Sequence, residues 1–172
     1  MDIRYRLSQF WHNVTAKPLS GLEQEQITND LTPQELDLFK QMSINDQRHG
    51  YRVYRLLRDS GHTDCDLLAA ALLHDVGKVK VDLSVWDRTL AVLGETFFPQ
   101  KAKEWGVGTN GGWKRTFVVR EQHAAWGGDL AEQAGSRKDV IDLILRHQEP
   151  VLLNGSGRDD RLALLQWADD QN

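Results

Sequence analysis

The adjacent residues His74 and Asp75 are the part of this sequence whose types and spacing point most directly to chemistry. They follow an apolar run, residues 67–73, and are themselves followed by Gly77 and Lys78. Burying a carboxylate beside an imidazole costs free energy unless a partner compensates both groups. A divalent metal ion is the usual partner for such a pair. The two residues therefore predict a metal site at the end of a buried helix.

The other candidate ligands are histidines or aspartates, and each lies on a separate predicted helix. They are His49, His123, His147 and Asp169. A helical bundle can direct such side chains into one central site. With His74 and Asp75 they supply four imidazoles and two carboxylates, enough for two divalent ions with Asp75 shared between them. Ligation rich in histidine suits Mn²⁺, Fe²⁺, Ni²⁺ or Zn²⁺ better than Mg²⁺.

Helix start and stop signals indicate the elements that position these residues. A capping box at Thr32 starts one helix, while Gly61 and Asp64 mark the end of the next helix and the start of its successor. The predicted helices cover residues 3–14, 33–42, 44–60, 67–73, 116–135, 136–147 and 160–170, with a short helix beginning at Ser84. Residues 15–30 are expected to be a polar linker, and residues 97–114 a long loop.

Several amphipathic helices and no convincing strand predict an all-α fold, a single-domain helical bundle. The length of 172 residues suits one domain. A net charge of −4 with mixed signs argues against nucleic acid as a bulk partner. No apolar run approaches the roughly 20 residues of a membrane span, the N-terminus lacks a signal-peptide core, and the single cysteine excludes an internal disulfide. We therefore expect a cytoplasmic protein without a membrane partner.

The succession of His49, the His74-Asp75 pair and Asp169 resembles the HD-domain superfamily of metal-dependent phosphohydrolases. The resemblance covers about residues 47–172 and implies an all-α bundle of the HD type. The preceding residues 1–46 match none of its motifs, and we expect them to form a helical extension packed on that domain.

The later histidines make the chain similar to the two-metal branch of this superfamily. That branch includes HD-type diadenosine tetraphosphate hydrolases and HD-type cyclic-dinucleotide phosphodiesterases. The resemblance implies that one ion is held by His49, His74, Asp75 and Asp169, and the other by Asp75, His123 and His147. It also implies catalytic roles for Asp75 as the shared ligand and for Lys78, which would touch a phosphate or the metal-bound water. The implied partner is a small phosphorylated substrate of the nucleotide type.

One departure separates the chain from the cyclic-dinucleotide phosphodiesterases. Gln148 follows His147 where those enzymes usually carry a second histidine, and their Gly-Tyr-Pro signature is absent from residues 154–157. Two alternatives to hydrolysis stay open: a catalytically silent sensor or interaction module that retains the metal site, and a dinuclear iron oxygenase. The sequence names neither the substrate nor the oligomeric state.

Overall fold

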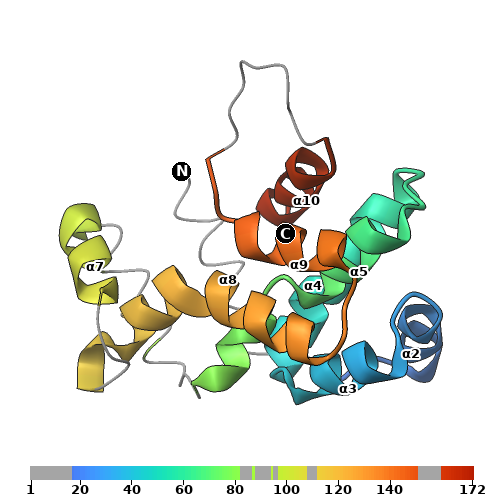
Figure 1. Ribbon diagram of the computed structural model, residues 1–172, viewed down its shortest axis with the longest axis horizontal. Coiled ribbons are helices and arrows are strands. Elements are labelled where there is room, and N and C mark those ends of the chain that lie inside the picture. The colour runs from blue at the N-terminus through green and yellow to red at the C-terminus, as the bar shows by residue number, and fades with distance from the viewer. Residues whose placement is uncertain (1–16, 82–86, 88–93, 95–96, 108–111, 151–159) are drawn as a thin grey trace.

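The computed structural model describes residues 17–81, 87, 94, 97–107, 112–150 and 160–172, and within these residues it contains helices and no strand (Figure 1). The helices are α2 (Gly21–Thr28), α3 (Pro33–Gln41), α4 (Ile44–Asp59), α5 (Cys65–Leu73), η1 (Val76–Lys80), α7 (Pro99–Gly106), η2 (Gly112–Lys114), α8 (Arg115–Gln133), α9 (Lys138–Arg146) and α10 (Asp160–Asp170). The predicted all-α fold is confirmed. No helix of the described part is long and apolar enough to cross a membrane.

Helix α5 is the centre of the bundle. Every residue from Leu67 to Leu73 is buried, and the helix packs against α3, α4, α9 and α10. The Asp64 side chain caps it by accepting hydrogen bonds from the backbone N–H groups of Asp66 and Leu67. A helix that is apolar on all sides can only be stable in the core. The residues that follow it, His74 and Asp75, are therefore delivered to the middle of the molecule.

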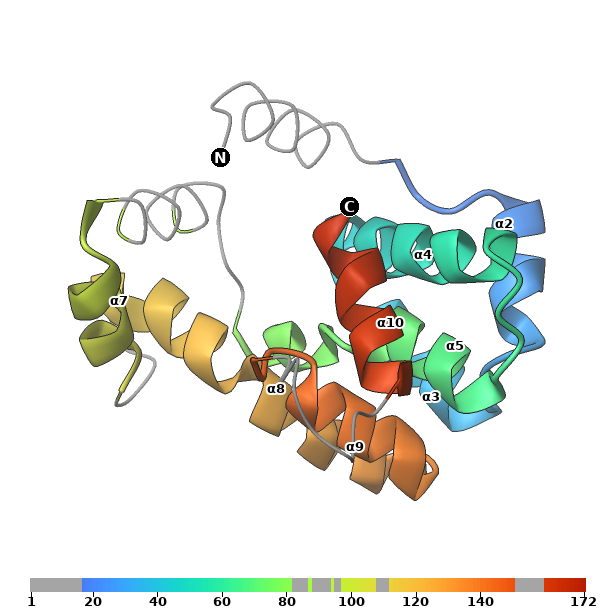
Figure 2. The same cartoon turned by 90° about the horizontal axis from the view of Figure 1, so that it is seen from above.

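Helix α8 forms the second part of the framework. It packs against α9 and η1 along one half and against α7 along the other, so that α7 lies at the end of the molecule away from α2 and α3 (Figures 1 and 2). The helix runs without interruption through Gly127 and Gly128. The predicted ligands thus come together around η1 and the end of α5. They lie on or directly after α4, α5, α8, α9 and α10.

Several predicted helix boundaries are confirmed. Thr32 and Glu35 form a reciprocal capping box at the start of α3. Gly61 follows α4 with a φ of 88°, a backbone conformation that favours glycine. The last helix has the predicted bounds. Helix α9 differs slightly, because Arg137 and not Ser136 is its N-cap residue.

Two segments predicted to lack helix are helical, and those predictions were wrong. Helix α2 lies within the expected linker of residues 15–30, where Ser20 and Glu23 form a capping box. Helix α7 lies within the expected loop of residues 97–114 and begins at a proline, Pro99, a residue favoured at the first helical position. A capping box therefore marks α2, where apolar periodicity is weak, whereas α7 has no side-chain cap and only the proline marks its start.

Two further predicted helices, residues 3–14 and the one beginning at Ser84, lie outside or largely outside the described residues. The division of the chain after residue 46 stays a prediction. The described residues on both sides of it are in contact: the Arg48 guanidinium donates hydrogen bonds to the carbonyls of Lys17 and Pro18 and pairs with Glu23. This pairing ties α2 and the segment before it to α4.

Candidate metal centre

The structure brings all six predicted ligands together in two adjacent groups. One ligand atom from each member of a group lies within 4.8 Å of the others. The first group is His49, His74 and Asp169, and the second is Asp75, His123 and His147. Four of the six lie within or directly after long helices, and the His74-Asp75 pair occupies the turn between α5 and η1. The remaining described histidine, His62, belongs to neither group, and His12 lies outside the described residues.

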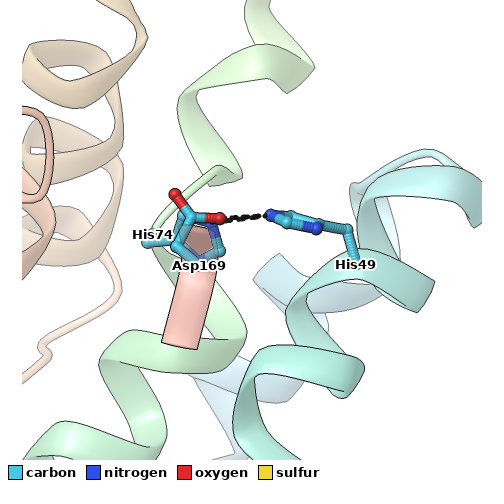
Figure 3. A group of neighbouring side chains, drawn as sticks. All are labelled: His49, His74 and Asp169. Carbon is cyan, nitrogen blue, oxygen red and sulfur yellow. Dashed lines mark hydrogen bonds and ion pairs between the residues drawn. The ribbon is translucent and has the colours of Figure 1, made fainter. Parts of the chain in front are cut away.

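The first group joins α4, the end of α5 and α10. The His49 side chain and the Asp169 carboxylate point toward each other, with 2.7 Å between His49 Nε2 and Asp169 Oδ1 (Figure 3). His74 Nε2 lies 3.3 Å from His49 Nε2 and 3.6 Å from Asp169 Oδ1. The side chains of His49 and Asp169 keep 20% and 33% of their surface exposed, so this group faces solvent.

The second group joins η1, α8 and α9 and is buried. His123 Nε2 lies 3.2 Å from His147 Nε2 and 3.2 Å from Asp75 Oδ1. The other carboxylate oxygen, Asp75 Oδ2, faces the first group at 3.6 Å from His74 Nε2 and 3.9 Å from His49 Nε2. Asp75 therefore directs one oxygen to each group, as a ligand shared by two ions would.

Three of the histidines are oriented by hydrogen bonds from Nδ1 to backbone carbonyls. His74 Nδ1 donates to the Ala71 carbonyl, and His147 Nδ1 donates to the Ile144 carbonyl. His123 Nδ1 donates to the carbonyls of residues 119 and 120. Because a carbonyl can only accept, each neutral ring carries its proton on Nδ1 and presents the Nε2 lone pair to the site. Such bonds are the usual means of fixing the tautomer of a metal-binding histidine.

This arrangement fits a divalent metal ion. With both Nδ1 atoms acting as donors, the Nε2 atoms of His123 and His147 lie 3.2 Å apart, so their lone pairs face each other wherever Nε2 carries no proton. Facing lone pairs are stabilised only by a proton or a cation between them. The donor set of imidazole nitrogens and carboxylate oxygens suits Mn²⁺, Fe²⁺, Ni²⁺ or Zn²⁺.

Glycine at position 77 allows η1 to approach α8 closely enough to form the second group. A Cβ atom there would lie 1.9 Å from the His123 carbonyl oxygen and 2.7 Å from the Gly127 nitrogen. Both are backbone atoms, which cannot rotate away. Gly127 itself, one turn after His123, approaches Ile144 of α9 and Gly77. Backbone contact at these glycines places Asp75 within reach of His123.

Replacing Gly77 with alanine is expected to separate η1 from α8. The cost of overpacking is about 1–3 kcal/mol in the free energy of unfolding, and the shift should also weaken metal binding at the second group. Urea unfolding and titration with Mn²⁺ measure the two effects. Gly21→Ala is the matched control, because no atom lies within 4 Å of a Cβ at that position. Unchanged stability and metal binding in Gly77→Ala would show that the close approach is unimportant.

The charged side chains of the site shift one another's pKa values strongly. Burial opposes a charge on His74, but the negative charges of Asp75 and Asp169 outweigh it and raise its pKa to about 9. Burial likewise opposes the charged form of Asp75, yet Lys78 and His74 hold its pKa well below its usual range. The pKa of Asp169 is also lowered, because hydrogen bonds from His49 and His74 outweigh burial. Both carboxylates are therefore ionised and ready to bind cations.

His147 behaves differently from His74. Burial and the positive charge of His74 lower its pKa to about 3, so it is neutral at physiological pH. A cation that binds the second group consequently displaces no proton from His147. A cation that binds the first group must displace one from His74.

Metal binding at the first group is therefore expected to be pH-dependent. Below pH 9 His74 is protonated, so a bound ion releases one proton and the apparent Kd should increase up to about tenfold for each pH unit lost. Calorimetric titration with Mn²⁺ at pH 7 and pH 8, in buffers with different ionisation enthalpies, counts the released protons. An affinity that does not change between these pH values would contradict the protonated state of His74.

Lys78 lies beside the two groups of predicted ligands. Its ammonium contacts Asp75 Oδ2, and its side chain is 32% exposed. The two arginines that neighbour ligands in sequence are engaged elsewhere: Arg48 binds the segment before α2, and Arg146 pairs with Asp142 and Glu149. Their guanidinium groups therefore have structural partners outside the metal groups.

One buried carboxylate near the site, Asp46, was not among the residues predicted from the sequence. It lies on the first turn of α4, three residues before His49, and is only 6% exposed. Its negative charge is one of those that raise the pKa of Lys78 against the effect of burial. The spacing of an aspartate three residues before a ligand histidine was the available signal, but an acid in the first turn of a helix is common for other reasons.

Comparison with known proteins agrees with this geometry. The family model described as HD domain matches residues 47–170, which include all six predicted ligands and Lys78. Neither curated proteins nor solved structures gave a match. HD domains bind divalent metals and are generally metal-dependent hydrolases. The chain is a member of the HD domain family.

Proposed function

We propose that the protein is a metal-dependent phosphohydrolase that binds two divalent ions and cleaves a phosphoester or phosphoanhydride of a small, nucleotide-like substrate. The observation that carries the proposal is the position of Asp75. Its two oxygens face two separate groups, each completed by histidines. A carboxylate shared in this way is suited to holding two ions close together.

The residues of the chain have distinct tasks in this reaction. Ions held by the two groups would supply Lewis-acid charge that activates a water molecule and neutralises phosphate oxygens. The buried Nδ1 bonds fix the histidine rings, so the ligands need little reorganisation when an ion binds. Lys78 adds a positive charge next to Asp75 and can contact a phosphate oxygen.

The direction from which a substrate approaches follows from exposure. The second group is buried, with His123 and Asp75 side chains at 3% and 6% exposure. Asp169, His49 and Lys78 are the partly exposed members of the site. A phosphate group would therefore reach the site over the first group and beside Lys78.

The test is a hydrolysis assay on the protein loaded with Mn²⁺. The substrates should include dinucleoside polyphosphates, cyclic dinucleotides, nucleoside triphosphates and nucleoside monophosphates. We expect metal-dependent cleavage of at least one nucleotide class, with loss of activity on chelation. If metal is bound and every phosphoester survives, the protein is a sensor module. If turnover instead requires iron and dioxygen, it is an oxygenase.

A further inference from the structure

Gln166 connects two helices that carry ligands of different metal groups. It lies on α10, three residues before Asp169 of the first group, so the two side chains leave the same face of that helix. Its Nε2 donates hydrogen bonds to the backbone carbonyls of His147, at 2.9 Å, and Glu149, at 2.7 Å. His147 directly follows α9 and belongs to the second group. One side-chain amide therefore joins the helix of a ligand in the first group to the backbone of a ligand in the second.

The end of α9 needs a donor of this kind, because the last carbonyls of a helix have no partner within the helix. The Ile144 carbonyl accepts a hydrogen bond from His147 Nδ1. The Arg146 carbonyl accepts one from the backbone N–H of Glu149. The next carbonyl along the chain, that of His147, accepts its hydrogen bond from Gln166. His147 is thus held at its ring by α9 and at its backbone by α10.

The surroundings of the Gln166 amide define its orientation. Because a carbonyl can only accept, the group that faces the carbonyls of His147 and Glu149 must be the NH₂. The amide oxygen, Oε1, is then buried and has no hydrogen-bond partner among the residues that the structure describes. A buried oxygen without a donor destabilises the folded state. The glutamine therefore satisfies the end of α9 while its own oxygen stays unpaired, which indicates a role in placing that turn.

We propose that Gln166 is a positioning residue for His147. By fixing the backbone of this histidine, it keeps His147 Nε2 at 3.2 Å from His123 Nε2, where the second group would hold its ion. Partners of this kind orient a ligand and raise the affinity for metal. The inference rests on the metal site of the proposed function and not on hydrolysis. A protein that binds two ions and cleaves no phosphoester would refute the hydrolysis and leave this role intact.

Two substitutions, measured by Mn²⁺ titration at pH 8, separate positioning from charge. Gln166→Met removes the donor, and Gln166→Glu places an ionised oxygen against the two carbonyl oxygens. Both should weaken binding of the second ion about tenfold or more, the range typical of a lost outer partner. A role through charge alone predicts the opposite for Gln166→Glu, because a negative charge one turn from Asp169 attracts a cation. A Gln166→Glu protein that binds two Mn²⁺ ions as tightly as the wild type would overturn the proposal.

The His123→Ala background shows at which group Gln166 acts. Only the first group should bind an ion there, so adding Gln166→Met should leave the Mn²⁺ affinity nearly unchanged. An equal loss of affinity in both backgrounds would mean that Gln166 supports α10 as a whole, which contradicts the proposal. Gln24→Met is the matched control, because Gln24 Nε2 donates to the Leu19 carbonyl beside α2, a helix without predicted ligands. It should not change Mn²⁺ binding.

A measurement on the wild-type protein decides if the Gln166 variants do not fold or if His123→Ala binds no ion. In a crystal structure of the Mn²⁺-loaded protein, we expect Gln166 Nε2 to stay within hydrogen-bond distance of the His147 carbonyl while His147 Nε2 binds the ion. A metal-bound His147 whose carbonyl has separated from Gln166 would overturn the proposal, because the ligand would then be placed without this bond.

Discussion

Replacing Asp75 with asparagine is expected to remove metal from both groups and to abolish phosphohydrolase activity. The change preserves the size of the side chain but removes the charge that both groups share. Loss of an outer partner of a metal ligand typically costs about 10- to 100-fold, so loss of a shared ligand should exceed this range. Metal content per chain, measured by mass spectrometry, and nucleotide turnover report the two effects.

Asp170→Asn is the matched control for this experiment. Asp170 is an exposed aspartate next to Asp169 on α10, and it belongs to neither group. The control should retain both ions and full activity. An Asp75→Asn protein that binds two ions with unchanged affinity would show that Asp75 is not the shared ligand.

Replacing His123 with alanine is expected to remove only the ion of the second group. The first group keeps His49, His74 and Asp169, because none of these contacts His123. The Mn²⁺ content should fall from two ions per chain to one, and activity should fall by roughly 100-fold or more, since a single ion cannot neutralise both sides of the reacting phosphate. Calorimetric titration with Mn²⁺ measures the stoichiometry.

His62→Ala serves as the control for this second change, since His62 lies between α4 and α5 and in neither group. It should leave two ions bound. If His123→Ala loses both ions together, the two groups form one inseparable site. If it loses none, the second group does not bind metal.

The grouping of the six predicted ligands could be expected from the sequence, because the residue types themselves, histidine and aspartate, indicated it. A His-Asp pair after an apolar run has few structural explanations, and every residue of α5 from Leu67 to Leu73 is buried, as the apolar run predicted. The bounds of α10 and the capping box of α3 followed from equally local signals. The structure adds the distances, which show that residues far apart in sequence, His49 and Asp169, are in direct contact.

The features that were not predicted from the sequence have physical reasons for being missed. Helix α2 buries a single residue, Ile27, so no apolar periodicity marks it, and only its capping box could have revealed it. The role of Gly77 depends on the carbonyl of His123, a long-range contact that no local pattern encodes. Asp46 looks like an ordinary acid near a helix start, and only its effect on the pKa of Lys78 distinguishes it.

The central claim is that these six residues hold two metal ions around Asp75. Crystals of the protein loaded with Mn²⁺, measured by anomalous diffraction at the manganese edge, test it most directly. We predict two peaks about 3.5–4 Å apart, one among His49, His74 and Asp169 and one among Asp75, His123 and His147. A single peak, or peaks away from these side chains, would contradict the account.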